Sequence, residues 1–126
     1  MAHYLERLQR YGNTSRDEFL GDEDKRVAAE RYLHLALECV LDLANHVIAD
    51  RGLATPESYG SSFRVLCEAS LLEAGLAESL RKLAGMRNIL VHDYLEIDHE
   101  LTLRSIQNDL GDLRSFAMAI AGLLEE

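Results

Sequence analysis

The residues best suited to chemistry lie in one short segment, Arg-Asn-Ile-Leu-Val-His-Asp-Tyr, residues 87–94. An arginine can hold a phosphate through two N–H groups and stabilise the negative charge that develops on it during a reaction. A histidine can accept or donate a proton near neutral pH. The segment adds a phenol at Tyr94, but it has no pair of carboxylates and no set of metal ligands. Arg87 and His92 are therefore suited to work on a phosphodiester.

If that phosphodiester belongs to RNA, the 2′-hydroxyl of the substrate can be the nucleophile, so neither a metal nor a protein nucleophile is required. The residues alone thus suggest a metal-free ribonuclease. A structural alternative stays open, because Arg87 and His92 of an acidic protein can instead pair with surface carboxylates. Asp93 is one possible partner for Arg87, or else a solvated residue at the end of a helix.

Helical spacing places Arg87 on an apolar stripe. Arg87 and Tyr94 are one heptad apart, which leaves them about 20° apart on a helical wheel, in line with Leu80 and Leu83. A guanidinium is costly to bury without a partner. This end of the stripe must therefore open onto solvent or meet an anion.

A second pair of polar residues lies on a neighbouring edge of the same helix. His92 is about 40° round from Asn88, four residues earlier, so the imidazole and the amide are neighbours. The Asn88 side chain can bond either to His92 or to a backbone carbonyl. Tyr94 belongs to the opposite edge, which leaves two ways to gather these residues in one cleft. Either the helix unwinds near Asp93, or two copies of the chain face each other across a symmetric interface.

The elements that position this segment are all predicted to be helices. Asp22 and Gly52 bound a helix of nearly thirty residues, with Asp22 as its N-cap. A second long helix is predicted to begin after the N-cap Asp98 and to run unbroken to the end of the chain. Its apolar residues step by three and four: Leu103, Ile106, Leu110, Leu113, Ala117, Ile120 and Leu124.

Shorter helices complete the prediction. One ends near Gly12, one follows a capping-box pattern of Ser15 with Glu18, and one begins at Thr55-Pro56 and continues through Cys67. Another carries leucines from Leu76 onward and holds residues 87–94 on its last turns. We therefore expect a single all-α domain over residues 1–126, an up-down helical bundle of four to five main helices.

Composition bears on the cellular location of the protein and on its need for a metal or cofactor. The chain has 126 residues, of which 48% are hydrophobic, and it has no apolar run long enough to cross a bilayer and no secretory signal at its start. The sequence thus predicts a cytoplasmic protein without membrane attachment. Cys39 and Cys67 are read as core residues, since they lack metal-ligand spacing, and neither a metal nor a cofactor is expected.

Charge argues against a protein that coats nucleic acid, because the formal net charge is −9. The local charge near the motif differs in sign from the net charge of the chain. Over residues 81–94, Arg81, Lys82 and Arg87 stand against Asp93, and three minus one gives a local charge of +2. This distribution favours selective access of an RNA over tight nonspecific binding.

The spacing of Arg87, His92 and Tyr94 resembles the Arg-x4-His-x-Tyr motif of the HEPN superfamily, in its HepT toxin branch. The similarity extends to LRKLAGMRNILVHDYLEID, residues 80–98, and to ECVLDLANHVIADRGLATPESY, residues 38–59. It covers roughly residues 20–120. The bare arginine and histidine spacing is common, and the asparagine, the tyrosine and the flanking segments make the resemblance specific.

The resemblance implies a helical bundle that forms a symmetric homodimer, with the motifs of both subunits in a shared cleft, and a metal-independent RNase acting on cellular RNA. Arg87 and His92 would be catalytic, with Asn88 and Asp93 supporting the site. A minimal nucleotidyltransferase (MNT) antitoxin would silence the toxin by transferring AMP to Tyr94. Adenylate would bring negative charge and bulk to the edge of an RNA site.

Two other classes of function remain alternatives. The chain can be a non-catalytic helical module that binds nucleotide or RNA, in which case unmodified protein would bind without cleaving. It can also be a structural partner of a nucleotidyltransferase, in which case a His92 substitution would leave toxicity unchanged.

Overall fold

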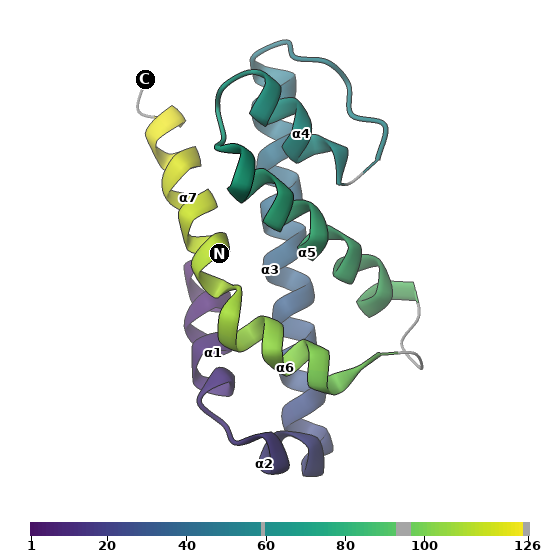
Figure 1. Cartoon of the computed structure of the whole chain (residues 1–126). Coiled ribbons are helices and arrows are strands. Elements are labelled where there is room, and N and C mark those ends of the chain that lie inside the picture. The colour runs from purple at the N-terminus through teal and green to yellow at the C-terminus, as the bar shows by residue number, and fades with distance from the viewer. Residues whose placement is uncertain (59, 93–96, 125–126) are drawn as a thin grey trace.

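Helices form every regular element of this computed structural model, which describes residues 1–58, 60–92 and 97–124 (Figure 1). Over those ranges there are seven helices and no strand: α1 (Ala2–Gly12), α2 (Arg16–Gly21), α3 (Glu23–Asp50), α4 (Ser61–Glu68), α5 (Ala74–His92), α6 (His99–Asn108) and α7 (Leu110–Leu124). The predicted all-α class is confirmed. The expected four to five main helices were too few.

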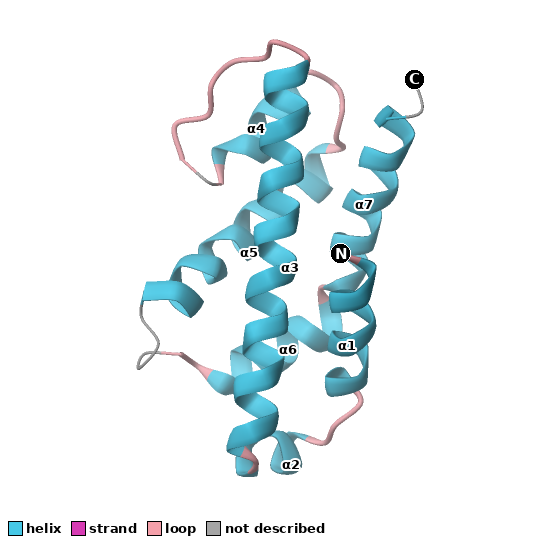
Figure 2. Ribbon diagram, turned by 180° about the vertical axis from the view of Figure 1, so that it is seen from behind, coloured by secondary structure: helices cyan, strands magenta, loops and turns pink. Residues whose placement is uncertain are grey.

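The 28-residue helix α3 is the axis of the fold. Its N-cap is Asp22, as predicted, and the Asp22 carboxylate accepts a hydrogen bond from the backbone N–H of Lys25 at 3.1 Å. It ends before Gly52, whose φ of +65° is a conformation that glycine adopts without steric cost. Figure 2 shows α3 running the length of the molecule, with α1 and α7 along one side and α5 crossing behind it toward the other.

In the described part of the chain, α3 is also the one helix long and apolar enough to cross a membrane by length and composition. Of its most apolar 18-residue window, 44% is buried inside the structure. A helix at the centre of a bundle meets the same criteria, because burial selects the same apolar residues. The apolar character of α3 is therefore accounted for by its place in the core.

The core joins α3 to the helices around it. Leu33, Leu37, Val40 and Ala44 of α3 are all at most 2% exposed. Phe63 of α4 and Phe116 of α7 meet edge to face, with ring centroids 5.9 Å apart and an interplanar angle of 86°.

The predicted start of the fourth helix at Thr55-Pro56 is wrong. α4 begins only at Ser61, and the residues before it form a loop. The Ser61 hydroxyl accepts from the Ser58 backbone N–H and donates to the Ser58 carbonyl, both at 2.8 Å, which closes a local turn ahead of the helix. The buried face that would stabilise a helix begins at Ser62 and Phe63, too late to hold Thr55 in a first turn.

The prediction of one unbroken helix from Asp98 to the chain end is also wrong. The helix breaks at Asp109. The Asp109 N–H donates the last hydrogen bond of α6, to the Ser105 carbonyl, and the Asp109 carbonyl accepts from the N–H of Asp112 at 3.1 Å. A short polar side chain competes with the helical backbone for such bonds. Both helices keep an apolar face, so the apolar spacing continues across the break: α6 packs on α1, α2 and α3, and α7 packs on α1, α3 and α5.

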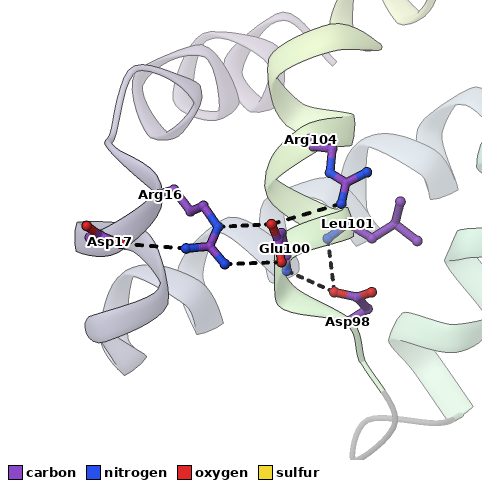
Figure 3. A network of polar contacts seen from close by, with 6 residues as sticks. All are labelled: Arg16, Asp17, Asp98, Glu100, Leu101 and Arg104. Carbon is purple, nitrogen blue, oxygen red and sulfur yellow. Dashed lines mark hydrogen bonds and ion pairs between the residues drawn. The ribbon is translucent and has the colours of Figure 1, made fainter.

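Two predicted caps are confirmed, and a third contact fixes α6 in place. The Asp98 carboxylate accepts from the N–H groups of Glu100 and Leu101 at 3.1 Å each (Figure 3). The Ser15 hydroxyl accepts from the Glu18 N–H at 3.2 Å. Arg16 of α2 donates to Glu100 of α6 at 2.9 Å, so the first turn of α6 is tied to a helix far away in the sequence.

Candidate active site

Helix α5 positions the predicted motif. Its residues Leu80, Leu83 and Ala84 are at most 5% exposed, which fixes the face of α5 that turns toward the core. Arg87 follows one turn later, and only 12% of its side chain is exposed. His92 is the last residue of the helix.

The structure places some of the predicted site residues and not others. Arg87 and Asn88 are described in full. The side chain of His92, and the whole of Asp93 and Tyr94, lie outside the described residues. The predicted neighbourhood of Asn88 and His92, and the predicted roles of Asp93 and Tyr94, therefore stay predictions.

Glu38 of α3 is the anion that meets Arg87. The Nε–H of Arg87 donates to Oε1 of Glu38, whose side chain is 29% exposed. The sequence predicted that Arg87 either opens onto solvent or meets an anion. In the described residues it meets the carboxylate of Glu38, 49 positions earlier in the chain. An arginine this well covered is held in place because its charge is paired.

Sequence reasoning missed Glu38, although a signal was present. Glu38 is in helical register with Leu41, Asn45 and Ile48, a stripe of which Leu41 and Ile48 are buried. A carboxylate in such a stripe needs a buried or half-buried partner of opposite charge. Spacing along the chain does not identify the distant cation that faces Glu38.

His34, one helical turn before Glu38 on α3, contacts the same carboxylate. Its Nε2 lies 3.2 Å from Oε1 of Glu38, and its Nδ1 lies 3.1 Å from NH1 of Arg31. A carboxylate can only accept and a guanidinium can only donate. The neutral imidazole that satisfies both neighbours therefore carries its proton on Nε2.

The charge of Glu38 follows from these neighbours. Burial alone would raise the pKa of the Glu38 carboxyl, but the hydrogen bond and charge of Arg87, and then the hydrogen bond from His34, together hold that pKa below its ordinary value. Glu38 is thus an anion at neutral pH. Arg87 faces a permanent negative charge from the side of α3.

Asn88 contacts Arg87 from the other side. Its Oδ1 accepts from NH1 of Arg87 at 3.1 Å, and its side chain is exposed. This bond uses only Oδ1 of Asn88, so the predicted contact of the Asn88 amide with His92 or a backbone carbonyl stays a prediction. The guanidinium of Arg87 is consequently oriented by two named acceptors, one on α3 and one on α5.

The start of α6 is anchored to α3. Nδ1 of His99 lies 2.7 Å from Oε2 of Glu30, a side chain that is 5% exposed on α3. Together with the Asp98 cap and the Arg16–Glu100 pair, this contact fixes the start of α6 (Figure 3). The segment with Asp93 and Tyr94 thus joins two fixed points, the end of α5 and the start of α6.

A groove lies between α3 and α5 beside these residues. It has a volume of about 390 Å³. Arg31 and His34 line it from α3, and Leu90 and Val91 line it from α5. Two of its apolar lining residues are partly exposed, Val27 at 43% and Val91 at 36%.

A metal-ligand set is absent from residues 1–58, 60–92 and 97–124, where no three His, Cys, Asp or Glu side chains gather to hold an ion. Cys39 and Cys67 are free thiols.

Comparison with known proteins agrees with the motif. The family described as Ribonuclease HepT-like matches residues 1–120. The mRNA nuclease HepT of Shewanella oneidensis is 32% identical over 113 residues, which cover 89% of this chain and 84% of that protein. The tRNA nuclease HepT of Aphanizomenon flos-aquae is 30% identical over 100 residues, 78% of this chain and 67% of that protein.

Solved structures give the same answer at the level of the fold. A tri-AMPylated HEPN toxin of Shewanella oneidensis, in complex with its MNT antitoxin, superposes with a TM-score of 0.87 at 28% identity. The match covers 96% of this chain and 90% of the toxin. The chain therefore belongs to the ribonuclease HepT-like family, within the HEPN superfamily, as its Arg-x4-His-x-Tyr motif indicated.

Proposed function

We propose that this chain is a metal-independent endoribonuclease toxin that acts in the cytoplasm and is silenced by an MNT antitoxin. Arg87 and His92 carry out the cleavage, Asn88 and Asp93 support them, and Tyr94 receives AMP. Family membership and the nuclease activity named for the relatives support the reaction class. The single observation that carries the assignment of residues is the fixed position of Arg87 between Glu38 and Asn88.

The orientation of Arg87 matters because preorganised charge lowers the barrier of a reaction that builds up charge. A guanidinium that is already ordered loses little entropy when a phosphate binds. Glu38 and Asn88 provide that order. Arg87 also keeps its positive charge at every relevant pH.

The reaction follows from the substrate and two side chains. His92 accepts the proton of the ribose 2′-hydroxyl as the 2′-oxygen attacks the neighbouring phosphorus. The new O2′–P bond forms while the P–O5′ bond breaks, and the departing 5′-oxygen takes up the proton that the His92 imidazolium releases, which leaves His92 neutral again. Arg87 stabilises the extra negative charge on the phosphate oxygens between these two events. The products are a 2′,3′-cyclic phosphate and a 5′-hydroxyl, with no metal in any step.

We further propose a symmetric homodimer in which both motifs share one cleft. The exposed apolar side chains Val27 and Val91 line the groove between α3 and α5 and would be covered by a second copy. His34 and Leu90 line the same groove. Pairing through this face would place the helix end that carries His92 near the dimer axis.

Silencing through Tyr94 fits its place in the chain. Tyr94 follows His92 by two residues, so an adenylate on its phenol would bring a phosphate charge next to the end of α5. The similar toxin of Shewanella oneidensis carries three AMP groups in its complex with MNT antitoxin. A negatively charged group at this position would repel the RNA backbone.

The experiment that tests the reaction uses purified, unmodified protein, labelled RNA and excess EDTA. We expect cleavage to persist in EDTA, to yield 2′,3′-cyclic phosphate ends, and to stop when one 2′-deoxynucleotide replaces the ribonucleotide at a mapped site. Cleavage of the deoxy-substituted RNA at an equal rate would contradict the 2′-hydroxyl mechanism. Binding without cleavage would instead support the non-catalytic RNA-binding module.

A further inference from the structure

A second pocket lies beside the motif, between α4, the loop before it and α5. Its volume is about 500 Å³. Arg81, Gly85 and Asn88 line it from α5, and Ser61 and Arg64 line it from α4. Figure 1 shows α4 alongside the first half of α5, with the end of α5 extending beyond it.

This pocket shares one residue with the candidate active site. Asn88 lines the pocket and also accepts the hydrogen bond from Arg87. Arg81 and Asn88 are seven residues apart on one face of α5, or about 10 Å along the helix axis. An RNA strand with one phosphate at Arg87 would thus have its next nucleotides within reach of Arg81.

The charge of the pocket suits a phosphate. Two arginines and one carboxylate, Glu57, line it, so two minus one gives +1. The whole chain, in contrast, has a formal net charge of −9. Arginine binds phosphate through two parallel N–H groups, which gives both energy and orientation.

The present partners of the two arginines are easily exchanged. Arg81 donates to Glu78 at 2.9 and 2.7 Å, and Arg64 donates to Glu68 at 3.2 Å. All four side chains are more than half exposed. Exposed pairs of this kind contribute little to stability, because water screens them and the long side chains lose entropy. A phosphate can therefore replace either carboxylate at little cost.

Two glycines shape this pocket. Gly85 lies in the middle of α5, where glycine is less favourable than alanine, and no neighbouring atom would lie within 4 Å of an added Cβ. Packing thus gives no reason for a glycine there, while its missing side chain keeps the floor of the pocket open. At Gly60, an added Cβ would lie 3.1 Å from Cγ of Arg81, so the loop backbone passes closely over the arginine stem.

A slightly smaller and more apolar cavity near the end of α3 offers a comparison. It has a volume of about 440 Å³ and is lined by Ile48, Leu53 and Pro56 among others. Its lining includes Glu57 but no lysine or arginine. Of these two cavities, only the one between α4 and α5 has the chemistry of an anion site.

We propose that the pocket between α4 and α5 binds the RNA backbone next to the scissile phosphate, through Arg64 and Arg81. This inference rests on the proposed function and adds a substrate-positioning subsite to it. Because the two arginines hold a phosphate that does not react, they contribute to affinity and leave the chemical step unchanged. Their effect must then depend on the length of the RNA.

The test compares the double variant Arg64→Gln/Arg81→Gln with wild type on two substrates, a dinucleotide spanning a mapped cleavage site and a longer RNA with the same site. We expect the KM for the long RNA to rise about tenfold with kcat unchanged, and dinucleotide kinetics to stay as in wild type. The slope of log affinity against log salt should become shallower by about 1.4, two lost contacts at 0.7 each.

Arg10→Gln is the matched control, because Arg10 pairs with Glu6 at 3.1 Å on the exposed face of α1, away from the pocket. Gly85→Leu is a second variant that fills the floor without changing charge. It should raise the KM for the long RNA alone. Equal losses on both substrates, or no loss on the long RNA, would overturn the subsite.

Failure of the proposed function gives a different pattern. If wild-type protein does not cleave, RNA affinity measured by fluorescence anisotropy still compares wild type with the double variant. A weaker affinity and a shallower salt slope in the double variant would then support the subsite and reject the nuclease. Identical affinities would reject the subsite, whether or not the protein cleaves.

Discussion

Arg87 of α5 is ion-paired with Glu38 of α3, and the pair joins the helix that carries the motif to the central helix of the fold. The pairing leaves 12% of the arginine side chain and 29% of the glutamate side chain exposed. Arg87 is therefore a side chain with a fixed position before any substrate arrives.

Removing the carboxylate of Glu38 should slow RNA cleavage without removing a group that touches the substrate. We expect Glu38→Ala to lower kcat about tenfold, which corresponds to about 1.4 kcal/mol at 25 °C, because Arg87 must then be ordered during the reaction. Glu38→Gln keeps an acceptor oxygen and should lose less. Single-turnover kinetics on a labelled RNA measure both.

The matched control is Glu6→Gln, which removes an exposed carboxylate that also pairs with an arginine. It should leave kcat unchanged. Full activity in Glu38→Ala would show that Arg87 does not need this partner.

The Glu38 carboxyl should titrate below the ordinary glutamate value of about 4.3, because its partners Arg87 and His34 outweigh the effect of burial. A depressed native pKa means that the pair stabilises the fold fully above the unfolded pKa and loses this contribution as pH falls through the native pKa. Urea unfolding of wild type and Glu38→Gln should therefore differ most near neutral pH and converge in acid. A difference that grows on acidification would contradict the sign.

Tyr94→Phe should abolish AMP transfer while leaving RNA cleavage intact. The phenol oxygen is the proposed acceptor of AMP, and phenylalanine keeps the ring but removes that oxygen. Co-expression with the MNT antitoxin, followed by intact mass and peptide mapping across residues 87–98, measures the transfer. An adenylate still found on this peptide in the Tyr94→Phe protein would move the modification to another residue.

The edge-to-face contact of Phe63 and Phe116 should be a main link between α4 and α7. Phe116 is fully buried, and Phe→Ala substitutions in a core cost about 3–5 kcal/mol. Urea unfolding of Phe116→Ala should show a loss of that size. Met118→Ala on the same helix is the control, because Met118 is 76% exposed and such changes stay within about 0.5 kcal/mol. Equal effects of the two substitutions would contradict the described core.

Much of the fold was predictable from local signals. Asp22, Asp98 and Ser15 cap helices as their residue types predicted, because a cap depends on bonds to the next two or three residues. The break at Asp109 was not predictable from apolar spacing. The buried residues on both sides of it keep one periodicity, and the change of direction comes from different packing partners of α6 and α7.

The candidate site was predictable only in part. Spacing identified Arg87 as a charge on an apolar stripe and required a partner for it. The partner Glu38 lies 49 residues away on another helix, and no local rule pairs two positions at that separation. For the same reason Arg64, which joins Arg81 in one pocket, was absent from the local charge estimated over residues 81–94.

The most direct test of the central claim, that Arg87 and His92 cleave RNA, is single-turnover cleavage by unmodified Arg87→Ala and His92→Ala proteins. Each should be at least about 100-fold slower than wild type, and Arg87→Ala should also bind RNA more weakly. His92→Ala should keep the circular dichroism spectrum and the oligomeric state of wild type. His46→Ala, an exposed histidine of α3, should cleave normally. Wild-type turnover by either motif variant would contradict the proposed mechanism.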